Sequence, residues 1–490
     1  MQPPDGTEKV QKTGVSGQPG AARPSPADPV GPLRPWMAGD KPTAIANADR
    51  ILAASGGGSP APRAAAPMIR SFVAGGRGGH GAAPARADQA AAAAPGHMLA
   101  QVRLSSLLRR TGHWQRGLAL AEQLVRQWPR QVLARLELAQ VLTEAERFED
   151  AKLQYLLAVR LDPDHAAAHV GFAEMLMITG DIIPGWSEYA WRFRMAATQD
   201  KLPKLKIPQW NGMRWSRGRL LLIADQGYGH CLQYIRFLPW AASRVGEVAI
   251  ACNPKLAGLF GRMPGVARVV ERWEDLPQSD FRATLSDLPC LYGATLETLP
   301  RDVPYFSLDE AAVEGWRRRL RGLAGDDLKV GLSWSGRTDH LHNRLRSLPL
   351  AGLAPLAGTQ GVRFFSLQFD VEKKQIADWP GGGLIDLSPD LEGFERTAEC
   401  YSALDLVITI DTSSAHLAGA LGRPTWTLLR RVPDWRWLLE REDSPWYPTM
   451  RLFRQDADRT WGPVVQRVAS ELAAVARGDR AGLLPAVSTT

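Results

Sequence analysis

The chain has few cysteines, no long apolar run and no compact block of charge. Its four cysteines are spread over 490 residues without a CxxC pair, at Cys231, Cys252, Cys290 and Cys400. This spacing argues against a disulfide framework, and the apolar surroundings of three or four of them predict small core side chains in a reducing compartment. No run of about 18 uncharged apolar residues occurs, and the N-terminal MQPPDGTEKV lacks the apolar core of a signal peptide. We therefore expect no transmembrane helix and a cytoplasmic location.

Charge and composition separate the first 95 residues from the rest. The net charge is +8, and residues 1–95 carry 10 Lys/Arg against 6 Asp/Glu, so they supply +4 of it (10 − 6). The remaining excess is spread over about 395 residues, which argues against a nucleic-acid partner. Residues 1–95 are rich in Pro, Gly and Ala, and such a segment buries too little apolar surface to offset its ordering entropy. We expect this segment to be disordered.

Residues 97–196 repeat with a period of 34. The positions that share this step are Trp114, Phe148 and Ile182, then Gly117, Ala151 and Gly185, then Ala121, Tyr155 and Tyr189, and finally Pro129 and Pro163. A 34-residue helix–turn–helix unit with small residues at its helix crossing resembles the tetratricopeptide repeat. Three such units would stack and leave a concave groove. A plain helical bundle is the alternative, and four coincident series of positions argue against it.

From about residue 215 the pattern changes to buried strands that alternate with helices. The apolar runs are RLLLIA, EVAIAC and ARVVE in residues 215–320, then LKVGLSW, VRFFSLQ, GLIDLS, LDLVITI and PTWTLL in residues 325–478. This alternation predicts two doubly wound, Rossmann-like domains that bind ligands at the carboxyl ends of parallel strands. The expected fold class is α + α/β, a short helical solenoid followed by these two domains. We expect the solenoid to be a separate folding unit.

The stretch LDLVITIDTSSAHLAGALGRPTW combines a buried strand with a polar helix start. The strand delivers Asp411 to its carboxyl end, and Thr412, Ser413 and Ser414 open a helix that carries His416 in its first turn. Free backbone N–H groups and the positive end of the helix dipole favour a phosphate or diphosphate at such a place. The alternative is that Asp411 and Thr412 only cap the helix. We interpret the stretch as a phosphate- or diphosphate-binding site as well as a cap.

Five motifs in a fixed order carry a resemblance to a known family. They are WSEYAWRFR, PQWNGMRWSRGRLLLIADQGYGH, GLSWSG with NRLRSLPL, DTSSAHLAGALGRPTW and DWRWLLEREDSPWYPTMRLFRQ. Over about residues 97–475 the chain resembles bacterial tetratricopeptide-repeat proteins whose C-terminal part is similar to family 9, heptosyltransferase-like glycosyltransferases. The resemblance implies a GT-B fold, whose N-terminal half holds the acceptor and whose C-terminal half holds a nucleotide-sugar, with no metal or other cofactor. The pair His340 and His342 in a polar loop is a weak metal candidate.

Basic and aromatic residues complete the predicted donor site. Arg344 and Arg346 follow the turn at Gly336, where the resemblance implies a basic residue against the donor phosphates. A guanidinium stabilises the negative charge that builds up on a departing nucleoside diphosphate. The alternative is a solvated arginine pair. Trp435 is a candidate to stack on the base or sugar, although most of the 17 tryptophans are expected in the core.

The turn ADQGYGH, after the first predicted strand, holds the candidate catalytic residue. Gly227 and Gly229 form a glycine-rich turn before a helix, and His230 follows them. The resemblance implies E-Q-G-x-G-D here, with the final Asp deprotonating the acceptor hydroxyl, so Asp225 and His230 replace the family's Glu and Asp. Neutral imidazole can act as that base at pH 7. The alternatives are that Asp225 is the base or orients His230, that His230 only caps the helix, or that the base has been lost.

Two functions are compatible with these features. The first is an inverting, metal-independent glycosyltransferase that moves a sugar from a nucleotide-sugar to a protein such as flagellin, or to a glycan. The second is a non-catalytic scaffold or nucleotide-sugar-binding protein in envelope or polysaccharide assembly. The histidine at position 230 keeps the second function open.

Overall fold

The computed structural model describes residues 96–195, 198, 202, 204–337, 343–369 and 371–486. The predicted disordered segment 1–95 and the pair His340 and His342 lie outside the described residues, so both predictions stay predictions. The chain divides into two compact units, Met1–Leu107 and Leu108–Thr490, and the contacts reported below belong to the second. In the part of the chain that the structure describes, every helix is too short or too polar to cross a membrane.

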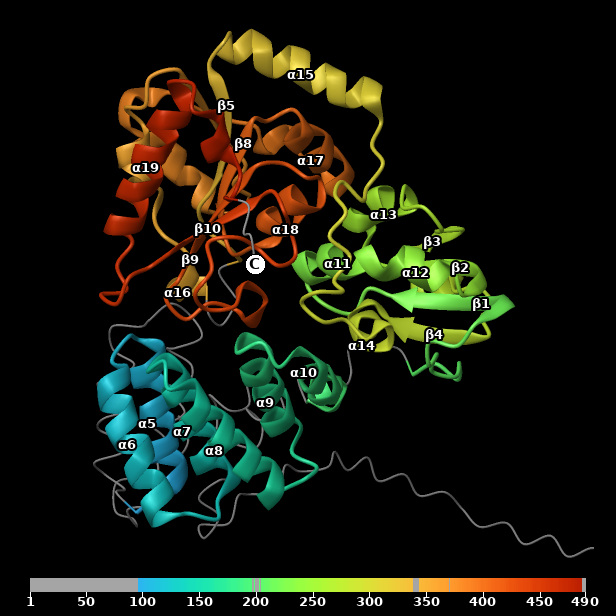
Figure 1. Ribbon diagram of the computed structural model, residues 1–490, viewed down its shortest axis with the longest axis vertical. Coiled ribbons are helices and arrows are strands. Elements are labelled where there is room, and N and C mark those ends of the chain that lie inside the picture. The colour runs from blue at the N-terminus through green and yellow to red at the C-terminus, as the bar shows by residue number, and fades with distance from the viewer. Residues whose placement is uncertain are drawn as a thin grey trace, which may run out of the picture. The chain divides into compact units, whose positions relative to one another are not determined.

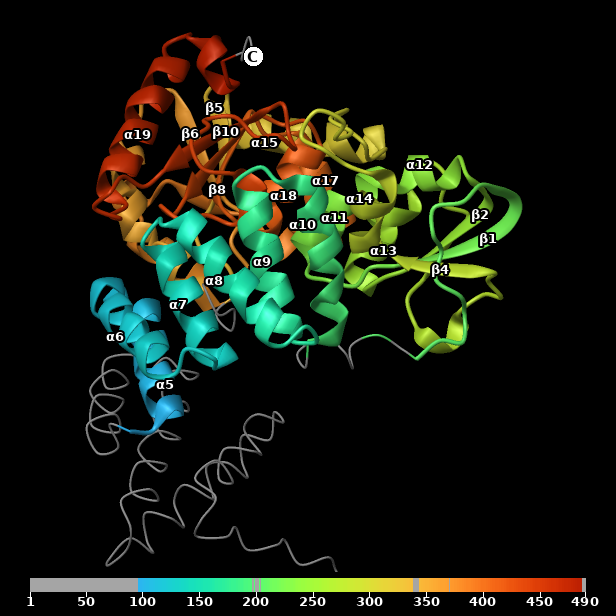
Figure 2. The ribbon, with the colours of Figure 1, turned by 60° about the horizontal axis from the view of Figure 1, so that its bottom comes forward.

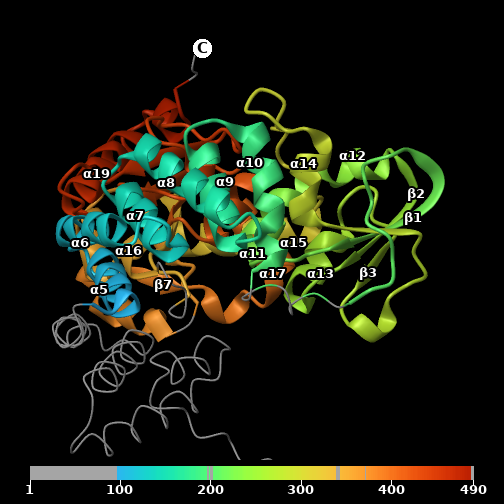
Figure 3. The same ribbon diagram turned by 90° about the horizontal axis from the view of Figure 1, so that it is seen from below.

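The repeat region consists of helices whose starts keep the predicted step. The helices are α5 (Met98–Arg110), α6 (Trp114–Gln127), α7 (Val132–Glu144), α8 (Phe148–Leu161), α9 (Ala166–Ile178) and α10 (Ile182–Tyr189), followed by the 3-10 helix η2 (Ala190–Arg194). Trp114, Phe148 and Ile182 are the first residues of α6, α8 and α10, which confirms the 34-residue period. A Cβ added to Gly171 would overlap the Tyr155 ring, so this helix crossing requires a small residue. Figure 3 shows α7 to α10 stacked in order.

The N-terminal α/β domain is built on a four-stranded parallel sheet. Its strands are β1 (Trp215–Ile223), β2 (Val245–Ala251), β3 (Arg268–Val270) and β4 (Phe281–Thr284), in the order β3-β2-β1-β4. Its helices are α11 (Tyr228–Tyr234), α12 (Leu238–Ala242), α13 (Pro254–Gly261) and α14 (Leu288–Tyr292). The strand order reverses between β1 and β4, so the switch point of this sheet lies between these two strands. The sequence did not reveal β4, because FRAT is short and carries an arginine.

The C-terminal α/β domain follows α15 (Glu310–Ala324) and contains a six-stranded parallel sheet. The strands are β5 (Leu328–Ser333), β6 (Val362–Ser366), β7 (Leu384–Asp386), β8 (Leu406–Ile410), β9 (Thr425–Leu429) and β10 (Met450–Arg454), in the order β10-β9-β8-β5-β6-β7. The helices are α16 (Asn343–Arg346), α17 (Gly393–Ser402), α18 (Ser413–Ala420) and α19 (Gly462–Ala476). Read from β7, this is the 3-2-1-4-5-6 order of Rossmann folds, with its switch point between β5 and β8. The predicted α + α/β fold class is therefore confirmed, although the sequence did not reveal β10.

The repeats share a hydrophobic core with both α/β domains, which corrects the expectation of a separate folding unit. Trp186 of α10 is 3% exposed, and its ring lies 5.3 Å from that of Trp435 in the C-terminal domain. The same ring lies 6.4 Å from that of Tyr234 in the N-terminal domain, and α10 contacts α14 of that domain, beside which Figure 2 shows it. In the second repeat, Glu144 of α7 forms an ion pair with Arg430 of the C-terminal domain at 2.6 Å. The repeats therefore contact both halves of the α/β region.

The cysteines are free thiols, and three of them are core residues. Cys231, Cys252 and Cys400 are buried, whereas Cys290 is exposed. Burial raises the pKa of the Cys252 thiol to about 12. Burial also raises the pKa of Cys231 and Cys400. Protonated, enclosed thiols behave as small apolar side chains, as the sequence predicts.

Candidate active site

The turn between β1 and α11 is held by side chains from two other parts of the chain. Asp225 follows β1 with a side chain that is only 2% exposed. The Ser286 backbone N–H, just beyond β4, donates to the Asp225 carboxylate at 3.2 Å, as does the Ser286 hydroxyl, and Arg192 of η2 lies 3.8 Å away. Gln226 accepts a hydrogen bond from the Tyr189 hydroxyl at 3.4 Å. Burial raises the pKa of Asp225, although the Arg192 charge opposes this shift. These contacts give Asp225 a structural role, and its role as a base stays a prediction.

The turn between β8 and α18 contains the expected helix cap. Thr412 has an extended backbone, and its hydroxyl accepts a hydrogen bond from the Ser414 N–H at 3.3 Å. The Tyr401 hydroxyl donates to the Ser414 hydroxyl at 3.1 Å, so Ser414 is fixed against α17. Asp411 and Ser413 remain partly exposed at the switch point. Capping is therefore one function of this turn, and the binding of a donor by its four partly exposed residues stays a prediction.

The two predicted turns meet, although they are far apart in the sequence. A Cβ placed on Gly229 would lie 2.7 Å from His416 Cδ2 and 3.3 Å from Ser413 Cα. The approach of α11 to α18, which Figure 1 shows between the two sheets, therefore requires glycine at position 229. Gly227 is different, because a Cβ there would meet nothing within 4 Å. His230 lies in the first turn of α11, and its ring centroid is 6.5 Å from that of His416. The structure thus brings His230 beside the predicted donor turn.

His416 is buried between α18 and its neighbours. The residue is 3% exposed, and its ring stacks on Trp437 with centroids 5.3 Å apart. Its Nδ1 atom lies 2.9 Å from the Tyr447 hydroxyl. Burial lowers the pKa of His416 well below its ordinary value, and the charges of Arg436 and His230 add to this effect. The structure therefore places a neutral His416 in the packing of α11 against α18, and its role in donor binding stays a prediction.

The turn after β5 carries Gly336 and adjoins the donor turn. The side-chain oxygen of Gln368, just beyond β6, accepts hydrogen bonds from the backbone N–H groups of Trp334 and Ser335, at 3.1 and 3.0 Å. Arg346 donates from Nη1 to the carbonyl oxygen of Asp411 at 2.8 Å, and a Cβ on Gly336 would lie 2.9 Å from Arg346 Nη2. No described residue accepts a hydrogen bond from the buried Nε of Arg346. Arg344 lies on the same short helix and is exposed. Arg346 is thus the arginine of the pair that reaches the switch point.

Asp411, Asp434 and the buried Arg436 determine the charge beside the donor turn. Burial raises the pKa of Asp411, and the nearby charge of Asp434 raises it further. Burial also disfavours the charge of Asp434, but its ion pair with Arg436 at 2.9 Å holds its pKa below the ordinary value. Arg436 is 2% exposed and donates to the side chains of Gln233 and Tyr234 on α11, at 2.7 and 2.6 Å. Arg436 therefore joins the two α/β domains, a role that the DWRW motif did not reveal.

Trp435 is a packing residue. It is 4% exposed, and its ring centroid lies 5.3 Å from that of Trp186 and 6.1 Å from that of Trp446. The Arg436 guanidinium lies 4.4 Å from the same centroid. An indole enclosed in this way has no face free for a base or sugar, so the structure corrects the prediction that Trp435 stacks on the donor.

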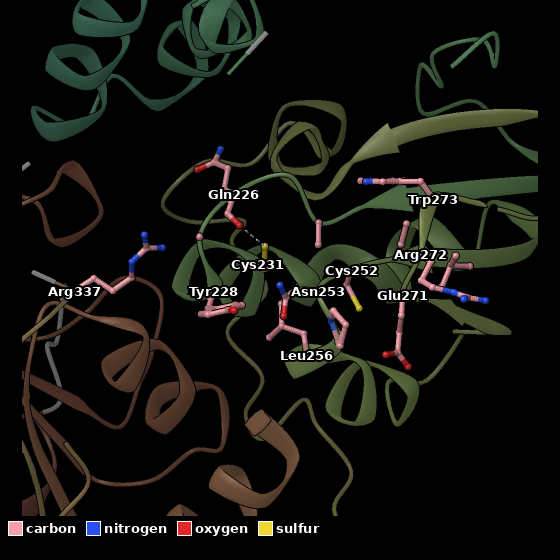
Figure 4. A pocket seen from close by; sticks show the side chains of 15 residues that line it. Gln226, Tyr228, Cys231, Cys252, Asn253, Leu256, Glu271, Arg272, Trp273 and Arg337 are labelled. Atoms are coloured by element: carbon pink, nitrogen blue, oxygen red, sulfur yellow. Dashed lines mark hydrogen bonds between the residues drawn. The ribbon is translucent and has the colours of Figure 1, made fainter. Parts of the chain in front are cut away.

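A pocket of about 400 Å³ opens at the carboxyl edge of the N-terminal sheet. The ends of β1, β2 and β3 line it with polar side chains that include Asn253, Glu271 and Arg272. Trp273 is part of the lining and is 43% exposed. Arg337 of the C-terminal domain also lines the pocket, and Figure 4 shows it on the ribbon opposite α11. The pocket therefore adjoins the glycine-rich turn and receives a side chain from each domain.

Metal binding has no candidate in the part of the chain that the structure describes. Within those residues, no group of three or more His, Cys, Asp or Glu side chains is suited to hold a metal ion. His340 and His342 lie outside those residues, so the expectation of a metal-free site stays a prediction.

Two parallel sheets of Rossmann type that follow a tetratricopeptide-like solenoid along the chain define a GT-B-like fold with fused repeats. No family model matches the chain. Over 395 residues it is 28% identical to Protein FlbA of Caulobacter vibrioides, and this match covers 73% of the chain but 62% of FlbA. The chain thus spans less than two thirds of that relative.

Solved structures of both expected classes are similar to the chain at low identity. The glycosyl transferase family 9 protein of Veillonella parvula is 11% identical, with 55% of this chain and 99% of that chain covered and a TM-score of 0.41. A thermophilic TPR protein of Thermus thermophilus is 17% identical, with 34% and 88% covered and a TM-score of 0.30. The fold assignment itself rests on the strand orders and repeat helices described above.

Proposed function

We propose that this chain is a glycosyltransferase that moves a sugar from a nucleotide-sugar to a protein or glycan acceptor. The observation that supports this proposal best is the contact of the two switch-point turns through Gly229, Ser413 and His416. In doubly wound sheets the switch point is where ligands bind, and here the helices that follow β1 and β8, the strands beside the two switch points, contact each other. A donor bound on one side and an acceptor on the other would have their reacting groups close together.

The donor side is the C-terminal domain. In this proposal the diphosphate lies between the turn at Gly336 and the start of α18, where Ser413 and the first helix amides can donate hydrogen bonds. Arg346 adds a positive charge there, and its buried Nε is a donor that no described residue satisfies. A guanidinium in that place stabilises the charge on the leaving nucleoside diphosphate, so the reaction needs no metal ion.

The acceptor side is the N-terminal domain with its pocket of about 400 Å³. In the proposed reaction His230 takes the proton of the acceptor hydroxyl, and the oxygen attacks the anomeric carbon. The bond from that carbon to the phosphate oxygen breaks, and the nucleoside diphosphate leaves with the electron pair. Attack from the face opposite the leaving group inverts the anomeric centre. His230 is favoured over Asp225 because the Asp225 carboxylate already accepts from Ser286 and faces Arg192.

The repeats would recruit the acceptor. A tetratricopeptide groove usually binds an extended peptide, so a protein acceptor such as flagellin fits the repeats, and a glycan acceptor fits the pocket. The enzyme would act in the cytoplasm, where its nucleotide-sugar donor is the co-substrate and no cofactor is needed.

The test combines binding with turnover. Thermal shift with a panel of nucleoside diphosphates identifies the donor base, since a ligand that binds the native state raises its stability. Release of that diphosphate from its nucleotide-sugars is then measured for wild type, His230→Ala and His230→Asp. If His230 is the base, the rate rises with pH as the imidazole becomes neutral, and His230→Ala lowers kcat about 10²–10⁴-fold at constant donor affinity. Wild-type turnover in His230→Ala would refute the assignment.

A non-catalytic scaffold is the second candidate, and two observations favour it. The residue at position 230 is histidine where the resembling family has aspartate, and Asp225 is engaged in structural contacts. Such a scaffold would bind the diphosphate with wild-type affinity but release none from any nucleotide-sugar. His230→Asp would then also be inactive, which separates the two candidates.

A further inference from the structure

We propose that Arg192, at the end of the repeats, is a positioning residue for the turn that carries His230. Arg192 lies in η2 and is only 6% exposed. Its guanidinium donates to the Ser286 hydroxyl at 3.0 Å from Nε and to the Asp287 carboxylate at 2.8 Å from Nη2. Its Nη1 also donates to the carbonyl oxygen of Tyr189 at 3.1 Å. A planar fork with these acceptors fixes the end of β4 relative to the repeats.

The contact continues from β4 to the glycine-rich turn. Ser286, which accepts from Arg192, donates its backbone N–H and its hydroxyl to the Asp225 carboxylate. The next residue, Gln226, accepts from the hydroxyl of Tyr189, three residues before Arg192. Both residues that precede Gly227 are therefore anchored, directly or through Ser286, to the end of the third repeat.

This arrangement matters because glycine makes the turn itself permissive. Gly227 has open space around its Cβ position, so packing at that residue does not fix the backbone. The place of His230, three residues further on, therefore depends on how Asp225 and Gln226 are held, in addition to the contact of Gly229 with His416. A displacement of about 1 Å at a reacting group lowers a rate by up to about 100-fold. The repeats thus supply part of the geometry of the reaction site in addition to any role in recruitment.

Arg194 offers a matched control in the same 3-10 helix. Its side chain is 64% exposed, and its ion pair with Asp164 at 3.4 Å involves a carboxylate that is 88% exposed. The same change, arginine to lysine, is made at both positions in the full chain. Arg192→Lys keeps a positive charge beside the buried carboxylates but cannot reproduce the fork, so the fold is retained while the geometry is lost. Ser286→Ala is the second variant, because it removes the hydroxyl that joins Arg192 to Asp225 but keeps the backbone N–H bond to Asp225 and the pairing of Arg192 with Asp287.

Amide hydrogen exchange followed by mass spectrometry measures directly how firmly the backbone of this turn is held. In Arg192→Lys and Ser286→Ala we expect amides of residues 224–235 to exchange at least about 5-fold faster, while residues 411–421 keep the wild-type rate. Arg194→Lys should match wild type in both segments. In the same proteins, turnover of the nucleotide-sugar found by the thermal-shift panel should fall about 10-fold, with the affinity for its nucleoside diphosphate within about 2-fold.

The outcomes separate this inference, which rests on the proposed role of His230, from the proposed function itself. Unchanged exchange of residues 224–235 in both Arg192→Lys and Ser286→Ala overturns the positioning role. Faster exchange throughout the chain, with equal losses of affinity and turnover, also overturns it and makes Arg192 a purely structural residue. If the wild type binds no nucleoside diphosphate, the proposed function fails, and the exchange measurement still decides whether Arg192 holds the turn.

Discussion

Replacing Gly229 by alanine tests the contact on which the candidate site depends. The new methyl group would lie 2.7 Å from His416 Cδ2, whereas ordinary van der Waals contact begins at 3.4 Å, so α11 and α18 must separate by about 0.7 Å (3.4 − 2.7). His416 cannot move aside easily, because it stacks on Trp437 and lies within hydrogen-bond distance of the Tyr447 hydroxyl. The strain must therefore be taken up by the contact between the two domains.

The expected magnitude follows from two opposing effects. Overpacking a filled contact costs about 1–3 kcal/mol. Alanine in place of glycine within α11 returns up to about 1 kcal/mol of helix propensity. We expect Gly229→Ala to lose roughly 1–2 kcal/mol in the free energy of unfolding. Because the shift moves His230 away from the donor turn, turnover should also fall about 10-fold, while the affinity for a nucleoside diphosphate changes little.

Gly227→Ala is the matched control, since it lies two residues away in the same turn. Gly227 has a φ of −62°, which alanine adopts without strain, and a Cβ there meets nothing within 4 Å. We expect this variant to equal the wild type or to gain a few tenths of a kcal/mol. Urea unfolding followed by tryptophan fluorescence compares the three proteins. If Gly229→Ala is as stable and as active as Gly227→Ala, α11 and α18 are not in the contact described here, and the argument for a shared site fails.

Three further predictions concern the donor turn and the core. Arg346→Ala should weaken nucleoside diphosphate binding by about 1–3 kcal/mol in calorimetry, whereas the exposed Arg344→Ala should change it by less than about 0.5 kcal/mol; equal effects would move the phosphate site elsewhere. Trp186→Ala should lower the free energy of unfolding by about 3–5 kcal/mol, and a small loss would show that the repeats do not share the core. The raised pKa of Asp411 means that ionisation of this carboxyl opposes folding. Its effect on the free energy of unfolding is therefore fully stabilising below its ordinary pKa near 4, and this stabilisation is lost as the pH rises through the raised value. Asp411→Asn should therefore be more stable than wild type by about 1 kcal/mol at pH 8 and equal to it at pH 4 in thermal unfolding; a variant less stable at pH 8 would contradict this.

Much of the architecture was predictable from local pattern. The 34-residue step placed the starts of α6, α8 and α10, because each helix must bury the same face against its neighbours. Continuous apolar runs marked eight of the ten strands, because a strand of a parallel sheet is covered on both faces and therefore has few polar side chains. The exceptions, FRAT and MRLFR, are short or alternate apolar with basic residues, so they lack this signal.

The candidate site was only partly predictable. A strand followed by Asp411 and Thr412, and a strand followed by Gly227, indicated loops at carboxyl edges, which is a local property of each segment. The sequence could not show that these loops face each other. It also could not distinguish Gly227, with open space, from Gly229, which lies against His416.

Burial and long-range pairing were decided by the tertiary structure. Trp435 and His416 look like ligand contacts in sequence, yet both are enclosed by residues far away along the chain. Arg192 carries no sequence signal beyond its place in WSEYAWRFR, and its partners at Ser286 and Asp287 are more than 90 residues away. Periodicity reports which face of an element is apolar, because that depends on neighbours within one or two turns. The packing of the whole chain determines which elements meet and which side chains remain open to a ligand. Local sequence patterns carry no information about that packing.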